Sequence, residues 1–248
     1  MIPRVSVVIP AYQEGSAIEE VMRRLLEAVQ LPCEIVVVVD SADDSTIPYV
    51  AKYARGDDRV RAVVNDVHPG PAHAIRFGIA EASAPVVVVT MADGCDDPQQ
   101  IDDLVRLVER GVVIAAASRY SRGGQQIGGP FLKSALSRMS GFSLWAFARV
   151  GTRDATNSFK AYDVPFLKDV GISSTAGFEI GIELVAKARR ARLPVAELPT
   201  IWLERHQGLS NFKLASWLPH YLRWWRFAYG PPLSVASIKQ STSEDRPR

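Results

Sequence analysis

The chain has 248 residues, of which 47% are hydrophobic and 23% charged, enough to build one large α/β domain or two small ones. Its formal net charge of +2 argues against a nucleic-acid-binding protein at the level of the whole chain. Cys33 and Cys95 lie too far apart for a disulfide framework or a zinc site, which suits a reducing cytoplasm.

Targeting and membrane-spanning segments are the next features to look for. Residues 1–10 lack the basic stretch and the long apolar stretch of a signal peptide. No apolar run reaches the roughly 18 residues that a transmembrane helix needs. We therefore predict a cytoplasmic location, and the unusual C-terminal part leaves peripheral attachment to the inner face of a membrane open.

The first half of the chain alternates between short apolar runs and segments with the apolar spacing of an amphipathic helix. Apolar runs without alternation are typical of strands buried on both faces of a parallel sheet. Ser16, with Glu19 three residues later, predicts a capping box at the first helix. We predict an α/β fold with a Rossmann-like, mostly parallel sheet flanked by helices. The predicted strands are residues 5–10, 34–40, 60–65, 85–93 and 112–118, and the predicted helices are residues 16–30, 49–55, 71–82 and 99–110.

The second half of the chain is less regular. The Gly-rich residues 121–130 predict a mobile loop. Helices are predicted at about residues 131–150 and at residues 178–191. Residues 154–163 are interpreted as a strand or turn, and residues 194–205 as an extended segment.

The C-terminal part combines aromatic and basic residues. Trp224 and Trp225 alternate with Arg223 and Arg226 within residues 212–232. Such a segment either packs on the domain or lies at a membrane interface, where Trp and Tyr anchor and basic side chains meet anionic headgroups. The predicted organisation is one domain at residues 1–211, this amphipathic segment at residues 212–232 and a disordered tail at residues 233–248.

Polar side chains occur at the points where the predicted strands end. Ligands of parallel α/β sheets bind beyond the carboxyl ends of the strands, so we expect these side chains to share one rim. They are Tyr12, Gln13, Glu14, Asp40, Asp43, Asp44, Asp93, Asp96 and Asp97.

The sequence VVVVTMADGCDDP places a group of carboxylates directly after an apolar run. Carboxylates without a nearby Cys/His set favour Mg²⁺ or Mn²⁺ over zinc. Asp93, at the end of the predicted strand, fits a metal ligand, and Asp96 is the candidate for a second one. Asp97 is equally well interpreted as the cap of a helix that begins near Pro98.

A glycine, Gly70, stands before the predicted helix at residues 71–82, which contains Arg76. The N-terminus of a helix at this place can meet a phosphate group, although glycine before a helix is a common pattern. His73 in the same helix is interpreted as a structural residue.

Several motifs occur together and in order: VSVVIPAYQEGSAI, VVVVDSADDST, GPAHAIRFGIAEA, MADGCDDP, SRYSRGG, DATNSFKAYD and ERHQGLS. In this order they resemble family 2 glycosyltransferases of the GT-A fold, and among these the dolichyl-phosphate or polyprenyl-phosphate sugar synthases. The resemblance covers residues 5–211. Its first four motifs imply a nucleotide-sugar donor, and its later motifs imply a lipid-phosphate acceptor.

The resemblance implies roles on the donor side. Pro10, Tyr12 and Glu14 would line the nucleotide pocket, Asp40 would contact the base or ribose, and Asp93 would bind the metal. Together with the helix N-terminus described above, the predicted nucleotide-sugar-binding residues are Pro10, Tyr12, Glu14, Asp40, Gly70, Arg76, Asp93 and Ser210.

On the acceptor side, Arg119 and Lys133 would face the acceptor phosphate. Arg205 and Ser210 would reach the donor diphosphate or that phosphate, and Glu183 occupies an acidic position of the family. Arg119, Lys133 and Arg205 are therefore the predicted catalytic residues. The family's reaction implies an inverting displacement.

The chain departs from the family pattern at several of these positions. Met91 stands where the family has the first Asp of an Asp-X-Asp motif, and Cys95 stands where a polar ligand is usual. Lys133 replaces an arginine and Asn211 a lysine. The metal site is therefore expected to rest on Asp93, with completion by Asp96.

We predict an enzyme that moves a sugar from a GDP- or UDP-sugar to a polyprenyl phosphate, with Mg²⁺ or Mn²⁺. A phosphate monoester is already anionic, so this acceptor needs cationic side chains to orient it and no strong base. One alternative is transfer to a hydroxyl group, with Asp154 or Glu183 as the base. Another is a catalytically silent nucleotide-sugar-binding protein, which the loss of the acidic residue at Met91 suggests.

Overall fold

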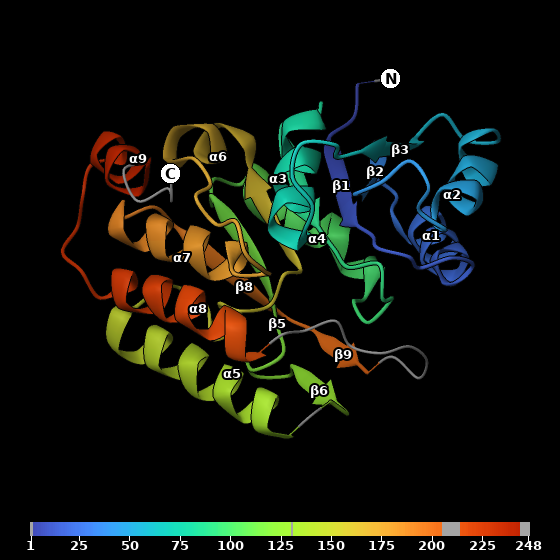
Figure 1. The fold of residues 1–248 in the computed structure, drawn as a ribbon. Helices are drawn as coiled ribbons and strands as arrows, with labels where there is room; N and C mark the ends of the chain where they lie inside the picture. Colours follow the sequence, from blue (N-terminus) through green and yellow to red (C-terminus); the bar gives the residue numbers. More distant parts are fainter. Residues whose placement is uncertain (1, 130, 205–213, 244–248) are drawn as a thin grey trace.

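Seven strands form one sheet in the order β3-β2-β1-β4-β7-β5-β8, and β6 and β9 form a second, two-stranded sheet (Figure 1). The computed structural model describes residues 2–129, 131–204 and 214–243. The strands are β1 Val5–Pro10, β2 Cys33–Val39, β3 Val60–Val64, β4 Val86–Val89, β5 Ile114–Ser118, β6 Gln125–Ile127, β7 Lys160–Asp163, β8 Val195–Pro199 and β9 Ile201–Leu203.

Helices connect these strands and cover the large sheet (Figure 1). The α-helices are α1 Ala17–Ala28, α2 Ile47–Ala54, α3 Pro71–Glu81, α4 Ile101–Glu109, α5 Phe131–Ser143, α6 Val164–Val170, α7 Ile180–Arg190, α8 Leu214–Ala228 and α9 Val235–Ser243. A short 3₁₀ helix, η1 Pro98–Gln100, precedes α4, and a π-helical segment, η2 Leu144–Ala148, follows α5.

The large sheet is parallel apart from one strand, which confirms the predicted α/β architecture. β1 pairs in parallel with β2 and with β4, so the strand order reverses between β1 and β4. Such a reversal opens a crevice at the carboxyl ends of the strands, where α/β proteins bind ligands. β7 runs antiparallel between β4 and β5.

The core lies on both faces of this sheet, as the continuous apolar runs predict. Successive residues of β1 point to opposite faces: Val7 belongs to the core that packs against α1, α2 and α4, and Val8 to the core that packs against α3 and α7. Gly78 allows α3 to lie close to the sheet, because a Cβ atom there would overlap Val8 and Val38.

The capping box predicted at α1 is wrong. Ser16 makes no side-chain capping bond, because its own backbone is helical with φ −69° and ψ −16°. The turn before α1 is closed instead by the Glu14 carbonyl, which accepts from the Ala17 amide at 3.2 Å.

The second half adds structure that the sequence pattern indicated only partly. The segment predicted as a mobile loop contains β6, which pairs with β9. α8 lies against α7, and its Trp224 is 2% exposed and donates to Ser174 Oγ at 3.0 Å. Within the described residues, no helix has both the length and the apolar character to cross a bilayer.

The prediction of disorder across residues 233–248 is wrong for the part that forms α9. This helix packs against α6, and Ile238 is fully buried there in the core. Val235 also packs on this core, and Lys239 Nζ donates to the Lys168 carbonyl at 3.1 Å, contacts that the polar composition of the segment does not indicate. Residues 244–248 lie outside the described residues.

Candidate functional site

The turn after β1 forms the first part of the predicted rim. The Gln13 amide donates to Asp44 Oδ2 at 3.0 Å and the Glu14 amide to Thr46 Oγ1 at 3.1 Å, so the turns after β1 and β2 are joined. Gln13 has φ +56°, a left-handed backbone that these bonds hold in place. Tyr12 is left 61% exposed beside the buried end of β1 at Pro10, as a residue that contacts a ligand requires.

Asp40, directly after β2, uses its carboxylate to fix the start of α3. Oδ2 accepts from the Gly70 amide at 2.8 Å, and Oδ1 accepts from Asn65 Nδ2 at 3.1 Å. Gly70 has φ +116°, a conformation that a side chain would strain. The structure therefore brings Asp40 and Gly70 together at the helix that also carries Arg76.

The three carboxylates after β4 have three different environments. Asp93 is partly exposed, and its Oδ1 accepts from the Cys95 amide at 3.0 Å. Asp96 is buried, and its Oδ2 accepts from Thr90 Oγ1 at 2.9 Å and from the Met91 amide at 3.3 Å. Asp97 caps η1 by accepting from the Gln99 amide at 3.1 Å, which confirms its predicted capping role.

Burial, with the nearby Asp93 charge as a second cause, raises the pKa of Asp96 to about 7 from an ordinary value of 3.8. The folded protein therefore binds a proton more tightly than the unfolded chain between about pH 4 and pH 7, so its stability falls as pH rises through that window. Each pKa unit corresponds to about 1.4 kcal/mol, so Asp96 can lower the free energy of unfolding by at most about 4 kcal/mol across this pH window.

The variant Asp96→Asn tests this pH dependence. An asparagine oxygen can still accept from Thr90 and Met91 but does not titrate. We expect the loss of unfolding free energy between pH 5 and pH 7, measured by urea denaturation, to be smaller in the variant than in the wild type. Parallel pH profiles for the two proteins would show that the Asp96 pKa is ordinary.

The carboxylates of this turn differ in how far they are available to a cation. Asp93 and Asp97 are both partly exposed, and each uses one oxygen to accept from a backbone amide two residues later, whereas Asp96 is buried and one of its oxygens is bonded twice. In the described part of the chain, no three His, Cys, Asp or Glu side chains gather as a metal-binding group. Mg²⁺ is commonly held by one or two carboxylates plus substrate phosphates, so this turn fits a cation that the donor's phosphates help to bind.

A buried ion pair lies at the end of β5. The Asp154 carboxylate accepts from Arg119 Nε at 2.7 Å, from Arg119 Nη2 at 2.8 Å and from the Arg119 amide at 3.0 Å. The Asp154 side chain is fully buried and that of Arg119 is 12% exposed. Burial alone would raise the pKa of Asp154, but the Arg119 charge and hydrogen bonds outweigh it, and the pKa lies below its ordinary value.

α5 docks on this ion pair through small residues. Arg119 Nη2 donates to Ser137 Oγ at 3.4 Å, and Ser137 Oγ lies 2.6 Å from Thr156 Oγ1. Gly141 lets the helix approach closely, because a Cβ atom there would overlap the Arg153 carbonyl. The serine- and glycine-containing face of α5 therefore faces inward, toward Arg119.

Three of the predicted residues cannot be placed by their side chains. Lys133 belongs to α5, but its side chain lies outside the described part of the structure. Arg205 and Ser210 also lie outside the described residues. Their predicted contacts with the donor or the acceptor remain predictions.

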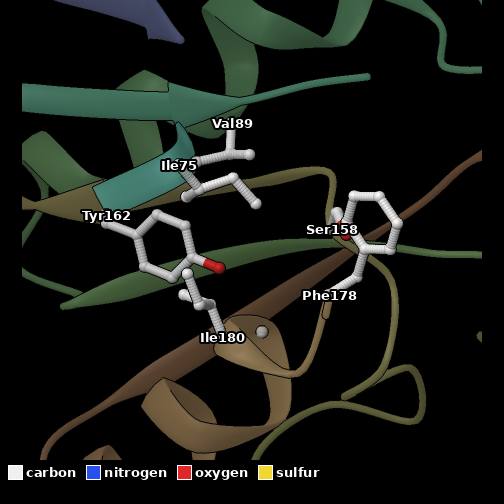
Figure 2. A pocket seen from close by; sticks show the side chains of 7 residues that line it. Ile75, Val89, Ser158, Tyr162, Phe178 and Ile180 are labelled. Carbon is white, nitrogen blue, oxygen red and sulfur yellow. The ribbon is translucent and has the colours of Figure 1, made fainter. Parts of the chain in front are cut away.

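Two cavities among the described residues are too small for a substrate. One has a volume of about 10 Å³, and Figure 2 shows the side chains of Ile75, Val89, Tyr162 and Ile180 around it. Another of about 10 Å³ lies between α1 and the turn that carries Asp96. This volume corresponds to about one water molecule, so we place the candidate site on the open rim.

Comparison with known proteins identifies the family of the chain. Residues 6–171 match the profile of the family described as Glycosyl transferase family 2. The chain belongs to this family. It is therefore a glycosyltransferase, and its sheet with flanking helices is the GT-A fold.

Among the curated relatives of this glycosyltransferase is "Dolichol-phosphate mannosyltransferase" of Pyrococcus furiosus, 31% identical over 214 residues. The match covers 85% of this chain but 59% of that protein, so the relative has a large part with no counterpart here. "Polyprenol monophosphomannose synthase" of Mycolicibacterium smegmatis is 28% identical over 230 residues. This match covers 86% of this chain and 86% of that protein. The predicted resemblance to polyprenyl-phosphate sugar synthases is confirmed.

Solved structures support the fold assignment. Glucosyl-3-phosphoglycerate synthase from Mycobacterium tuberculosis, in complex with Mn²⁺, UDP and glucosyl-3-phosphoglycerate, has a TM-score of 0.70 and 20% sequence identity. The match covers 94% of this chain and 82% of that structure. At this identity the similarity establishes the GT-A fold of the glycosyltransferase and leaves its substrates to other arguments.

Sequence reasoning missed three features of this site. Asp154 was considered only as a base, whereas it is the ion-pair partner of Arg119. Lys160 is fully buried on β7 but carried no prediction. The outward face of α5 is apolar, and the signal was present in the sequence: serines and large apolar residues alternate with a helical period from residue 131 to residue 143.

Proposed function

We propose that this glycosyltransferase moves a sugar from a nucleoside-diphosphate sugar to a polyprenyl phosphate at a membrane surface, with inversion and with Mg²⁺ or Mn²⁺. The observation that carries the proposal is the construction of α5. Its inner face contacts Arg119 through Ser137, and its outer face presents large apolar side chains to solvent. A lipid-linked anion needs both a cationic group for its phosphate and an apolar surface beside that group.

On the donor side, the leaving group is a nucleoside diphosphate whose negative charge grows as the sugar departs. The turns after β1, β2 and β4 supply the pocket, with Asp93 as the residue that would hold the cation. Such a cation supplies Lewis-acid stabilisation of the leaving diphosphate when it is bound. We propose that Arg76 and the start of α3 at Gly70 add positive potential at the same rim. We leave the choice between GDP and UDP donors to experiment.

On the acceptor side, we propose Arg119 as the main cation, because its ion pair with Asp154 fixes the guanidinium group. Asp154 engages the Nε and Nη2 side of the guanidinium and holds it in one orientation. We propose that the remaining Nη1 side meets the acceptor phosphate, with Lys133 and Arg205 completing the contact. Oriented cations of this kind place the anion in line with the anomeric carbon.

The environments of the two candidate bases favour this acceptor over a hydroxyl group. Asp154 is bound to Arg119, as described above. Glu183 is fully buried, accepts from the amides of Ser173 and Ser174 at 2.7 and 2.8 Å, and pairs with Lys187 at 2.6 Å. Neither carboxylate is free to take a proton from a sugar hydroxyl, whereas a phosphate monoester requires no base.

The outer face of α5 is unusual for a water-soluble helix. Phe131, Met139 and Phe142 are 87%, 69% and 56% exposed, whereas helices of soluble proteins turn such residues inward. Phe147 of η2 extends the same apolar surface and is 73% exposed.

α8 lies beside this surface and enlarges it (Figure 1). Trp225 Nε1 donates to Ser143 Oγ at 2.9 Å and joins α8 to the end of α5. Leu218 and Leu222, one turn apart, are 41% and 47% exposed. Trp224 therefore packs in the core, while Leu218 and Leu222 remain outside, and we propose that these leucines meet the membrane. We call the exposed apolar side chains of α5, η2 and α8, with Tyr229 directly after α8, the apolar face; its members are Phe131, Leu136, Met139, Phe142, Phe147, Leu218, Leu222 and Tyr229.

Charge around the apolar face favours an anionic bilayer as its partner. The sequence has no Asp or Glu from residue 110 to residue 153 or from residue 205 to residue 243, while both stretches contain several Arg and Lys residues. Exposed basic residues on the two helices include Arg138 and Arg226. Basic side chains around an apolar helix face are the pattern of proteins that bind at the membrane interface.

A turnover assay tests the proposed function. The protein is incubated with Mn²⁺ or Mg²⁺, a panel of GDP- and UDP-sugars, and either a short polyprenyl phosphate or the corresponding polyprenol. We expect sugar transfer to the phosphate and none to the alcohol. Transfer to the alcohol, or to neither acceptor with any donor, would refute the proposal.

The variant Asp93→Ala tests the cation site in the same assay. We expect turnover to fall by about a hundredfold or more, because charge stabilisation of the leaving group is lost. Nucleotide affinity, followed by calorimetry with and without Mn²⁺, should also lose its dependence on the cation. Asp97→Ala is the matched control, since this neighbouring carboxylate is used as a cap. Equal behaviour of Asp93→Ala and the wild type would remove the assignment.

A further inference from the structure

We infer that Lys160 is a positioning residue. Its buried ammonium group holds the backbone of residues 154–159 in place, so that Asp154 keeps the Arg119 guanidinium group in one orientation. The inference rests on the proposed function only for the identity of the acceptor. The geometry on which it depends lies wholly within the protein.

Lys160 occupies a position where a charged residue is rare. It is the first residue of β7, between β4 and β5, and pairs with Val89 on one side and with Ala116 on the other. Its side chain is fully buried. Lysine is almost never fully buried unless it is paired, so its position in the sheet calls for a specific role.

The ammonium group binds the chain that leads into its own strand. Lys160 Nζ donates to the carbonyl of Ala155 at 3.3 Å and to the carbonyl of Asn157 in a short contact. Gly181 of α7 keeps this space open, because a Cβ atom there would lie 3.3 Å from Nζ and 3.0 Å from the Asn157 carbonyl. The segment before β7 is therefore wrapped around the lysine head group.

The same segment is tied to β5 at both of its ends. Asp154 binds Arg119, the residue after β5, and Asn157 Nδ2 donates to the carbonyl of Ala117 at 2.9 Å. The ammonium group thus binds a short loop that is joined to Arg119 through Asp154 and to the Ala117 carbonyl through Asn157. Removing it would leave two buried carbonyls without a donor, and a shift of the loop would carry the Asp154 carboxylate with it.

The electrostatic environment agrees with this role. Burial lowers the pKa of Lys160 to about 7, although the charge of Asp154 acts to raise it. The side chain is therefore held in an environment that opposes its own charge, which the loop carbonyls and Asp154 partly offset. A lysine that only filled space would be replaceable by an apolar side chain of the same length.

The test uses Lys160→Met, which keeps the length and removes the ammonium. Its matched control is the double variant Glu183→Gln/Lys187→Met. Lys187 is also fully buried, and it also donates to loop carbonyls, those of Val170 and Gly171 at 3.3 and 2.8 Å. The two-site change avoids leaving the Glu183 charge unpaired.

The first readout is the NMR signal of the Arg119 Nε–H group, assigned by its loss in Arg119→Lys. We expect the signal to shift and to exchange faster with water in Lys160→Met, and to stay unchanged in the control. The second readout is steady-state turnover, where KM for the polyprenyl phosphate should rise about tenfold or more while KM for the nucleotide sugar stays within about twofold.

A folded Lys160→Met protein with the wild-type Arg119 signal and acceptor KM would overturn the inference, as would equal effects in the control. If Lys160→Met does not fold, Gly181→Ala replaces it, since the added methyl group presses on the ammonium and on the Asn157 carbonyl; there too, an unchanged Arg119 signal would count against a positioning role. A changed signal in a protein that glycosylates no lipid phosphate would refute the proposed function alone.

Discussion

Arg119→Ala should abolish measurable transfer to a polyprenyl phosphate and should also destabilise the protein by about 3–5 kcal/mol. The loss of turnover follows from the loss of the cation that orients the acceptor phosphate. The loss of stability follows because the fully buried Asp154 carboxylate would be left without its partner. Turnover and urea denaturation of the same preparation measure both effects.

A second variant separates the two roles of this arginine. In Arg119→Ala/Asp154→Ala no buried charge is left unpaired, so we expect much of the lost stability to return. Turnover should stay as low as in the single variant, because the acceptor still has no arginine. Recovery of activity along with stability would mean that Arg119 serves the fold and not the reaction. Arg119→Lys should keep the charge but lose the two-point contact with Asp154, and should fall between the wild type and Arg119→Ala.

The double variant Met139→Glu/Phe142→Glu should lose binding to anionic vesicles. Burial of a large apolar side chain contributes about 1.5–3 kcal/mol, so losing two should weaken binding by about a hundredfold or more. Added negative charge opposes an anionic surface further. Cosedimentation with vesicles containing phosphatidylglycerol measures the change, and vesicles of phosphatidylcholine alone give the charge-independent part.

Val67→Glu is the matched control for this face, since Val67 is also an exposed apolar residue, 64% accessible, and lies outside α5 and α8. It should bind vesicles as the wild type does. The Met139→Glu/Phe142→Glu protein should keep its turnover of a water-soluble, short-chain polyprenyl phosphate and lose it for a long-chain one embedded in vesicles. A wild-type protein that does not sediment with anionic vesicles would contradict the membrane role of α5 and α8.

The donor half of the molecule could be predicted from the sequence because its information is local. Continuous apolar runs such as IVVVV at residues 35–39 and the polar residues after them lie within a few positions of each other, and topology then brings the strand ends together. The individual hydrogen bonds could not be predicted in this way: Asp40 holds Gly70, thirty residues later in the chain.

The acceptor half depends on contacts that local patterns do not contain. Arg119 and Asp154 are separated by 35 positions and meet only because β7 inserts beside β5. The apolar period of α5 is the same whether that face points inward or outward, so its exposure emerges only from the packing of Ser137 and Gly141. α9 was not predicted because few apolar residues, chiefly Ile238 and Val235, attach it to the core.

The antiparallel strand β7 also fixes the distance between β4 and β5. β4 leads to Asp93 and β5 leads to Arg119, and β7 lies hydrogen-bonded between them. Two interstrand spacings of about 4.8 Å separate β4 from β5 by roughly 10 Å, and neither can move toward the other without breaking a ladder. In the transfer that we propose between Asp93 and Arg119, the sugar would therefore cross a span of constant width, and selection among donors of different size would fall to the turns above the sheet.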